Sequence, residues 1–359
     1  MSLVAILGAT GTQGGGVVET LLKSPKWSVR AITRNLDSEQ AKALKAKGAE
    51  VVAADANDEA SLIRAFKGAT AIFAVTAFWY AIHSPRIPSG IASRGDAPQQ
   101  GLPRDTIAYA IDFLAERPSA FKTGVHAAGD EEVQQLKNIF TAASKAGPDL
   151  QNLVLSSLPA AQRASGGKFH VPHYDYKEVA RDWAERNYPE VLAKTTMYWP
   201  GWYVSNMVNY PIYRPIRVPA AGGYLLAVPS RSDGVLPVTG DAAHNTGVIV
   251  EAVLDAGPRA HGKTVVAVTD WVRFADVAAE VGRVLGSPCA YAELSDEGAE
   301  VLWGPIIGGE NARQLRWSEE YPDWYSLSGE SSMSFAELGV EGRLVGFQEA
   351  LNGLNDQIM

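Results

Sequence analysis

The feature that most constrains this chain is a glycine-rich turn that lies directly between an apolar run and a helical pattern. Residues 3–7 are apolar, residues 8–14 read GATGTQG, and apolar residues then recur at helical spacing over residues 17–22. A second apolar run, over residues 29–32, ends in Thr33-Arg34-Asn35. This order of strand, turn, helix and strand is typical of the opening βαβ unit of a dinucleotide-binding fold.

The turn suits a pyrophosphate for two physical reasons. The helix N-terminus carries unpaired N–H groups and a partial positive charge, which attract a phosphate. Glycines let the backbone turn tightly and come close to the ligand. The spacing G-x-x-G-x-x-G differs from the commoner G-x-G-x-x-G, and a glycine-rich loop without a ligand is the alternative. We expect the cofactor to contact Gly8, Thr10, Gly11, Thr12, Gln13 and Gly14.

Arg34, at the end of the second strand, indicates which dinucleotide is bound. Proteins that bind NAD place an acidic residue there to bond the ribose hydroxyls, and an acid would repel a 2′-phosphate. Here the next carboxylate along the chain is Asp37. A guanidinium can hold a phosphate through charge-assisted hydrogen bonds worth roughly 1.5–3 kcal/mol. The sequence therefore predicts NADP(H) as the cofactor, with a solvated surface arginine as the alternative.

Charge, apolar runs and cysteine content argue against several classes of protein. The 359 residues carry a formal net charge of −8, which argues against a nucleic-acid surface. No apolar run approaches the ~18–20 residues of a membrane helix, and the chain enters its first strand at once, so we expect neither a membrane span nor a signal peptide. The single cysteine, Cys289, fits a reducing compartment. We expect a cytoplasmic location, with the nucleus as a further one.

Strands and helices continue to alternate after residue 35. Such alternation predicts an α/β fold of the Rossmann type, a doubly wound parallel sheet with right-handed crossovers. The predicted strands cover residues 51–55, 71–76, 153–157 and 195–198. The predicted helices cover residues 39–47, 59–66, 130–146 and 179–187.

Two segments depart from this alternation. Residues 81–126 are rich in proline and longer than a normal connection, which predicts an insertion with a helix over 106–116. Beyond residue 200, shorter strands, two further helices and an aromatic tail predict a smaller lobe. We therefore expect residues 1–200 to form the NADP-binding Rossmann domain, with the insertion, and residues 201–359 to form a smaller α/β substrate lobe and C-terminal tail.

Several of these motifs together resemble the NmrA-like branch of the atypical short-chain dehydrogenases/reductases. The resemblance rests on residues 8–15, on Thr33-Arg34-Asn35, on Asp55, on the aromatic turn at 75–79 and on the loop at 200–206. It implies a Rossmann domain and a small C-terminal lobe, with NADP(H) in the cleft between them. The further cofactor contacts that we expect are Asp55, Ala56, Asn57, Val75, Thr76, Ser156, Lys177, Pro200, Trp202, Tyr203 and Asn206.

The candidate proton donors lie in the segment 173–177, which reads HYDYK. Typical short-chain dehydrogenases use a Tyr-x-x-x-Lys pair, but here His173 stands four residues before Lys177. Positions four apart share a helix face, and Tyr174 lies nearly on it. Three interpretations stay open: Lys177 acts alone as acid and base, as similarity to isoflavone-reductase-like members implies; His173 or Tyr174 delivers the proton; or Lys177 only bonds the nicotinamide ribose.

The remaining features favour an organic substrate and no metal. His170-x-x-His173 has no visible third ligand, so we expect no metal site. The resemblance implies either a reductase or a cofactor-sensing regulator. We expect an NADP(H)-dependent oxidoreductase that exchanges hydride with a small organic carbonyl, imine or alkene, aromatic and secondary-metabolite compounds included. The alternative is a non-catalytic redox sensor that acts through a protein partner.

Overall fold

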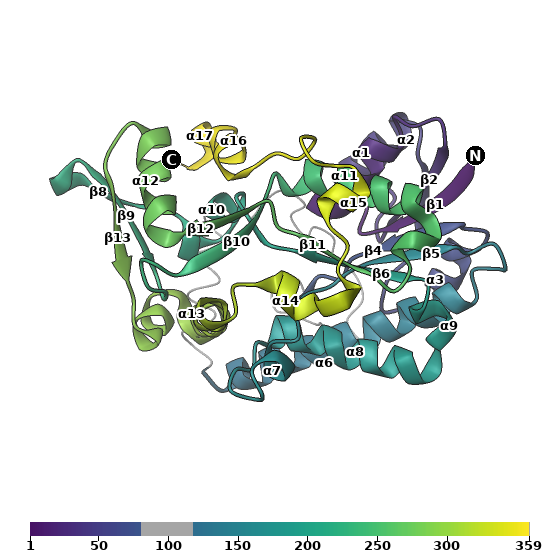
Figure 1. Ribbon diagram of the computed structural model, residues 1–359, viewed down its shortest axis with the longest axis horizontal. Helices are drawn as coiled ribbons and strands as arrows, with labels where there is room; N and C mark the ends of the chain where they lie inside the picture. Colours follow the sequence, from purple (N-terminus) through teal and green to yellow (C-terminus); the bar gives the residue numbers. More distant parts are fainter. Residues whose placement is uncertain (80–117, 359) are drawn as a thin grey trace.

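The computed structural model describes residues 1–79 and 118–358 of the chain, and the predicted helix over 106–116 lies outside them. Strands and helices alternate in its first part (Figure 1). In chain order they are β1 (Ser2–Leu7), α1 (Thr12–Leu21), β2 (Trp27–Thr33), α2 (Glu39–Ala46), β3 (Glu50–Ala53), α3 (Glu59–Phe66) and β4 (Ala71–Ala74). Then follow α6 (Pro118–Ser144), β5 (Asn152–Ser156), α7 (Ala161–Ala164), α8 (Pro172–Asn187), α9 (Pro189–Leu192) and β6 (Thr195–Pro200).

Within the described residues, seven parallel strands form the main sheet, in the order β11-β6-β5-β4-β1-β2-β3. The last to join along the chain is β11 (Thr264–Ala267), at one edge. The strand order reverses between β1 and β4, which pair side by side. In sheets of this kind, ligands bind outside the carboxyl ends of the strands at such a reversal. The predicted α/β fold of the Rossmann type is confirmed.

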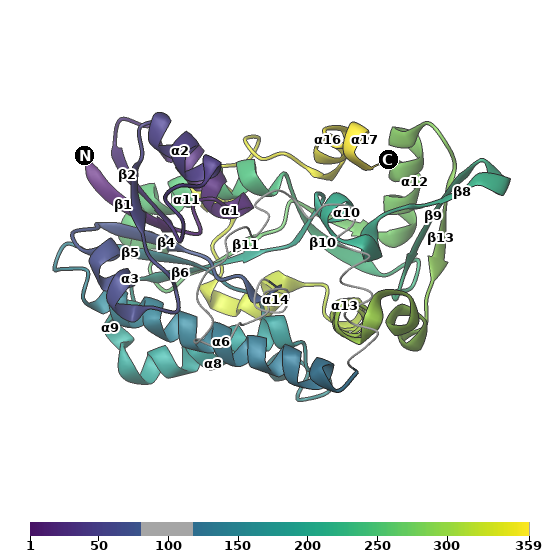
Figure 2. The same cartoon turned by 180° about the vertical axis from the view of Figure 1, so that it is seen from behind.

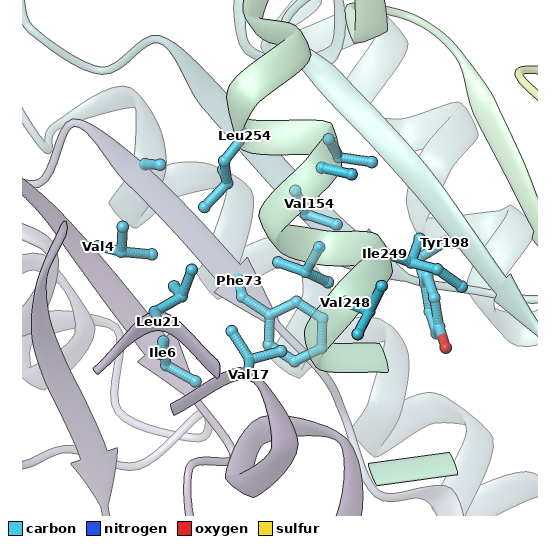
Figure 3. Close-up of a cluster of buried hydrophobic side chains, with 14 of the residues drawn as sticks. Val4, Ile6, Val17, Leu21, Phe73, Val154, Tyr198, Val248, Ile249 and Leu254 are labelled. Atoms are coloured by element: carbon cyan, nitrogen blue, oxygen red, sulfur yellow. The ribbon is translucent and has the colours of Figure 1, made fainter. Parts of the chain in front are cut away.

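Helices cover both faces of this sheet (Figures 1 and 2). Helices α1 and α11 (Ala242–Ala256) pack on one face, and α3, α6 and α8 pack on the other. In Figure 3, Ile6 and Phe73 of the sheet lie beside Val17 of α1 and Val248 of α11. Burial of such apolar surface contributes roughly 25 cal/mol per Å², and it stabilises the sheet whose strand ends carry the site described below.

The backbones of helices α1 and α11 come close together where the helices cross, because both carry a glycine there. A Cβ on Gly16 would lie 1.8 Å from the oxygen of Ala243, and a Cβ on Gly247 would lie 2.5 Å from the oxygen of Gly16. Any side chain at these positions would therefore force the helices apart. The crossing holds α1, which follows the glycine turn, against a helix from beyond residue 200.

Beyond β6 the chain builds a smaller lobe around two three-stranded sheets, β12-β10-β7 and β13-β9-β8. Their strands are β7 (Trp202–Tyr203), β8 (Ile216–Val218), β9 (Gly223–Val228), β10 (Val235–Gly240), β12 (Asp270–Arg273) and β13 (Cys289–Glu293). The helices beyond β6, apart from α11, are α10 (Asn206–Asn209), α12 (Phe274–Leu285), α13 (Asp296–Glu320), α14 (Trp324–Ser328), α15 (Phe335–Leu338), α16 (Phe347–Asn352) and α17 (Asn355–Ile358). None of the described helices is long and apolar enough to cross a bilayer. The division at residue 200 stays a prediction, since β11 and α11 return to the main sheet.

Two helices begin earlier than the sequence pattern predicts. Helix α6 begins well before the acidic residues 130–132, and Gly129 lies inside it, where a Cβ would be 2.2 Å from the ring of Tyr176 on α8. This glycine allows close packing of the two helices and does not mark a helix end. Helix α8 begins at Pro172, because proline suits the first turn of a helix. The segment 173–177 therefore lies on the helix.

Candidate functional site

The glycine turn between β1 and α1 forms a cradle with no room for a side chain at Gly8 or Gly14. Gly8 has a φ of 82°, in the left-handed region, and its oxygen accepts a 2.9 Å hydrogen bond from the N–H of Gly11. A Cβ on Gly14 would lie 2.2 Å from the Gly8 oxygen. Thr10 and Thr12 are exposed, and α1 begins without a capping side chain. No side-chain cap competes with a ligand for the first N–H groups of the helix.

Gln13, buried in the first turn of α1, connects the glycine turn to the chain beyond β6. Its Nε2 donates a hydrogen bond to the hydroxyl of Tyr203 in β7, whose pKa is raised by burial. Its Oε1 is buried and has no hydrogen-bond partner among the described residues. A buried acceptor without a partner costs about 1–3 kcal/mol, so a donor on a ligand would be stabilised here. The glycine turn and Gln13 thus fit a dinucleotide.

Arg34 lies one strand away from the glycine turn. Strand β2 runs parallel to β1, with Ile32 opposite Leu7, so Arg34 follows β2 at the level where the turn follows β1. Its side chain is exposed. Arg34 and the turn therefore stand at the carboxyl ends of neighbouring strands, on the side of β1 away from β4.

Asp55, Ala56 and Asn57 form a turn after β3 that is already tied to the protein. The N–H of Asn57 donates a 2.9 Å hydrogen bond to Oδ1 of Asp55, and the oxygen of Ala56 accepts one of 2.8 Å from Nδ2 of Asn138 on α6. Asp58, and not Asp55, caps α3. The turn is thus fixed at the carboxyl edge of the sheet by its own hydrogen bonds.

The segment after β4 contacts the glycine turn directly. A Cβ on Gly8 would lie 2.6 Å from Cγ1 of Val75, which follows the strand. Thr76 Oγ1 donates a 2.6 Å hydrogen bond to Oε1 of Glu132 on α6 and accepts one of 3.2 Å from Nζ of Lys177 on α8. Lys177 therefore reaches the carboxyl end of β4, where the strand order reverses.

Lys177 and Glu132 form an ion pair that is almost wholly buried. Nζ lies 2.5 Å from Oε1, and the exposed fractions of the two side chains are 10% and 1%. Sequence reasoning missed Glu132, because it stood in an acidic stretch interpreted as a helix start. Glu132 stands four and seven residues before Leu136 and Ile139, two buried residues of α6. This helical spacing indicates that Glu132 lies on the buried face of the helix.

His173 and Tyr174, the other candidate proton donors, lie in different surroundings. Nδ1 of His173 lies 2.7 Å from Oε1 of Glu310 on α13, and the histidine ring lies 5.2 Å from that of Trp79, in the segment after β4. Tyr174 packs edge-on against Trp317, with ring centroids 5.4 Å apart, and burial raises its pKa. The structure therefore places His173, and not Tyr174, beside the segment after β4.

Four further predicted contacts follow the carboxyl ends of β5 and β6. Ser156 is the last residue of β5 and is buried, and Pro200 is the last residue of β6. Trp202 is buried in β7, with its ring 5.3 Å from that of Tyr213. Asn206 begins α10 and is half-buried. The parallel strands bring Ser156 and Pro200 to the sheet edge that carries the glycine turn, and Trp202 and Asn206 follow β6 in the chain.

The two histidines that raised the question of a metal pair bind separate carboxylates. Nδ1 of His170 lies 3.0 Å from Oδ2 of Asp175, while His173 contacts Glu310. Across residues 1–79 and 118–358, no three or more His, Cys, Asp or Glu side chains converge on a place that could hold a metal ion. Each of the two histidines near the N-terminus of α8 thus forms a pair with its own carboxylate.

The chain matches one protein family over most of its length. The model of the NmrA-like family matches residues 1–87 and 119–336. The NmrA-like family domain-containing oxidoreductase FrzB of Cladobotryum sp is 28% identical over 299 residues, which cover 80% of this chain and 75% of that protein. The corresponding oxidoreductase himF of Aspergillus japonicus is 27% identical over 307 residues, which cover 82% and 76%.

Solved structures with the same fold hold nicotinamide dinucleotides. NmrA, a negative transcriptional regulator in complex with NAD, gives a TM-score of 0.67 at 19% identity, over 99% of this chain and 95% of that one. The NADPH-dependent quinone oxidoreductase QOR2 of Escherichia coli, complexed with NADPH, gives 0.65 at 20% identity, over 98% and 99%. Citrobacter sp. triphenylmethane reductase, complexed with NADP(H), gives 0.62 at 18% identity, over 98% and 99%. The family match and the fold agree, and the chain belongs to the NmrA-like family.

Proposed function

We propose that this protein binds NADP(H) and transfers hydride between it and a small organic carbonyl, imine or activated alkene. The observation that carries the proposal is the meeting of the glycine turn with Lys177 where the strand order reverses. Gly8 contacts Val75, and the next residue, Thr76, bonds Nζ of Lys177 at 3.2 Å. Lys177 thus reaches the end of β4, and Arg34 follows β2 on the opposite side of β1, so the two cations stand on either side of the glycine turn.

Each group has a task in this proposal. The glycine turn admits the pyrophosphate, Arg34 holds the 2′-phosphate and Lys177 bonds the nicotinamide ribose. The cofactor, when bound, supplies the hydride. Lys177 and His173 are the candidates for the accompanying proton, because burial among tryptophans raises the pKa of Tyr174 and opposes its ionisation.

Aromatic side chains around His173 favour a flat organic substrate. Its ring lies 5.9 Å from that of Phe78, and the ring of Trp79 lies 6.3 Å from that of Tyr210. Such faces bind planar groups by stacking. Two structural neighbours are named for a quinone and for triphenylmethane, which supports the same class. Tyr210 belongs to residues 201–359, the proposed substrate lobe on a Rossmann domain of residues 1–200, and the proposed location is the cytoplasm, with the nucleus as a further one.

The test has two stages. Calorimetric titration compares NADPH with NADH, and NADPH oxidation is then followed with a panel of quinones, enones and imines. Tighter binding of NADPH, with turnover of any of these compounds, supports the proposal. NADPH binding without turnover would favour the redox sensor that acts through a protein partner. Absence of binding for both dinucleotides would overturn the proposal altogether.

A further inference from the structure

The carboxylate of Glu310 joins α13 to the N-terminus of α8. Glu310 is fully buried, and its Oε1 accepts two hydrogen bonds from His173, one of 3.1 Å from the backbone N–H and one of 2.7 Å from Nδ1. Its Oε2 is buried without a hydrogen-bond partner among the described residues, and Nε of Arg313 lies 3.6 Å from it. The carboxylate therefore lies between the N-terminus of α8 and the guanidinium of Arg313.

This contact fixes which nitrogen of His173 can exchange a proton. An ionised carboxylate only accepts hydrogen bonds, so Nδ1 must carry the proton in the 2.7 Å contact with Glu310. In the neutral ring, Nε2 is then the nitrogen that carries the free lone pair. The histidine ring also lies 5.9 Å from the ring of Phe78 and 5.2 Å from that of Trp79, so it is held against the segment after β4.

The other two candidates are bound in ways that oppose proton exchange. Nζ of Lys177 donates hydrogen bonds to the buried carboxylate of Glu132 and to Thr76, so two acceptors of the protein already hold it. Tyr174 is 3% exposed, packs against tryptophans, and has a pKa raised by burial. His173 lies one helical turn from Lys177 on the same face of α8, and its ring lies against Phe78 and Trp79, which closely follow the Thr76 that Lys177 contacts.

We propose that Glu310 is a positioning residue that holds His173 as the Nδ1–H tautomer, and that Nε2 of His173 passes the proton that accompanies hydride transfer. This inference rests on the proposed function. In the reduction of a carbonyl, the substrate carbon gains a hydride, with its two electrons, from the reduced cofactor, and the substrate oxygen gains the Nε2 proton of the imidazolium. The products are an alcohol, the oxidised cofactor and neutral His173, which regains a proton from water.

The same end of α8 offers a matched control. Asp175 accepts a 2.8 Å hydrogen bond from the N–H of Val171 and lies 3.0 Å from Nδ1 of His170, so it makes the same two kinds of contact. It also accepts a 2.8 Å hydrogen bond from the N–H of Gln162. The side chain of His170 is 40% exposed, and its ring stacks on that of His126. Asp175→Asn therefore removes a comparable helix cap and histidine contact and leaves the contacts of His173 in place.

The first measurement is the tautomer of His173, by ¹⁵N NMR of histidine-labelled protein at about pH 8.5, well above the ordinary histidine pKa of about 6.5. The chain has six histidines, and the spectrum of His173→Gln identifies the signal. We expect the Nδ1–H tautomer in the wild type and a mixture in Glu310→Gln, because an amide donates as well as accepts. A wild-type protein with the proton on Nε2, or a tautomer unchanged in Glu310→Gln, would overturn the inference.

The second measurement is NADPH oxidation with a compound that the wild type turns over. Glu310→Gln and His173→Gln should each lower kcat about 100-fold with little change in the KM for NADPH, and the double variant should lose no more. Asp175→Asn should keep the wild-type kcat. Equal falls for Asp175→Asn and Glu310→Gln would mean that Glu310 is a structural cap, and would overturn the inference while the proposed function stands. A wild-type protein that binds NADPH and turns over no compound removes the proposed function, and the role of His173 with it.

Discussion

Nζ of Lys177 and Oε1 of Glu132 lie 2.5 Å apart in a buried ion pair between α8 and α6. Each charge depends on the other, because burial removes most of the water that would otherwise solvate it. A second pair, between the residue after α6 and the start of α3, is exposed: Nζ of Lys145 lies 3.2 Å from Oε1 of Glu59, and the two side chains are 50% and 44% exposed. Water and salt screen such a pair, so the two pairs should differ in their contribution to stability.

Loss of the buried cation should therefore be costly. Lys177→Met should lower the free energy of unfolding by about 3–5 kcal/mol, because it leaves Glu132 buried and unpaired. Lys145→Met should cost less than about 1 kcal/mol. The double variant Lys177→Met/Glu132→Leu should regain part of the loss, because it removes the orphaned charge. Urea denaturation measures all three, and equal losses in the two single variants would contradict the prediction.

Two adjacent glycines should respond in opposite ways to alanine. Gly14→Ala should lower stability by about 1–3 kcal/mol and abolish NADPH binding, because its Cβ would lie 2.2 Å from the Gly8 oxygen. At Gly15 the nearest atom to a Cβ is 3.6 Å away, so Gly15→Ala should stabilise α1 by up to about 1 kcal/mol. Thermal unfolding and calorimetry measure the two effects. Comparable NADPH affinity in both variants would rule out the proposed role of the turn.

Arg34 should discriminate between the two dinucleotides. Arg34→Ala should weaken NADPH binding by about 10- to 100-fold and NADH binding much less, because only NADPH carries a 2′-phosphate for the guanidinium. Lys42→Ala is the control, since it removes one positive charge from α2, where Lys42 pairs with Glu39 at 2.8 Å. Calorimetric titration of both dinucleotides is the measurement. Equal weakening of NADPH and NADH binding in Arg34→Ala would show that Arg34 does not hold the 2′-phosphate.

Cys289 should react slowly with iodoacetamide at pH 8. Burial raises the pKa of its thiol to about 11, against an ordinary value of about 8.5. At pH 8 the fraction of thiolate should therefore be at least roughly 100-fold smaller than in a free cysteine. The rate should climb with pH toward 11, and urea-unfolded protein should react at the rate of a free thiol. Because the unfolded chain ionises first, this thiol should also make stability fall as the pH rises above about 8.5. Equal alkylation rates for folded and unfolded protein would refute the burial argument.

The glycine turn could be predicted because its constraints are local. Gly8, Gly11 and Gly14 lie between a strand and a helix that adjoin them in the chain, and the structure keeps that order. Glu132 and Glu310 could not be assigned in this way, because they meet Lys177 and His173 across 45 and 137 residues of sequence. Their contacts depend on how α6 and α13 pack against α8, which no local pattern specifies.

The start of α6 also shows that a local pattern cannot replace knowledge of the packing. The acidic residues 130–132 have the local pattern of a helix start, so the sequence predicts a helix that begins at residue 130 and leaves Gly129 outside. Its role becomes visible only with the ring of Tyr176, which occupies the space that a side chain would need. The positions of Arg34 and Asp55 at strand ends followed from the alternation of strands, while their roles toward a cofactor stay predictions.

Strand β11 returns to the main sheet after the chain has left it at Pro200. It pairs with β6, with Thr264 opposite Met197 and Ala267 opposite Pro200, and α11 packs across α1 just before it. A fragment that ends at residue 200 would therefore lack an edge strand and the cover of one apolar face. The segment with strands β7 to β10 leaves the main sheet after β6 and returns to it at α11, so both of its ends are held at the same sheet. A single proteolytic cut within this segment would leave both pieces attached, because β9 and β10 also pair with β13 and β12, which follow β11 in the chain.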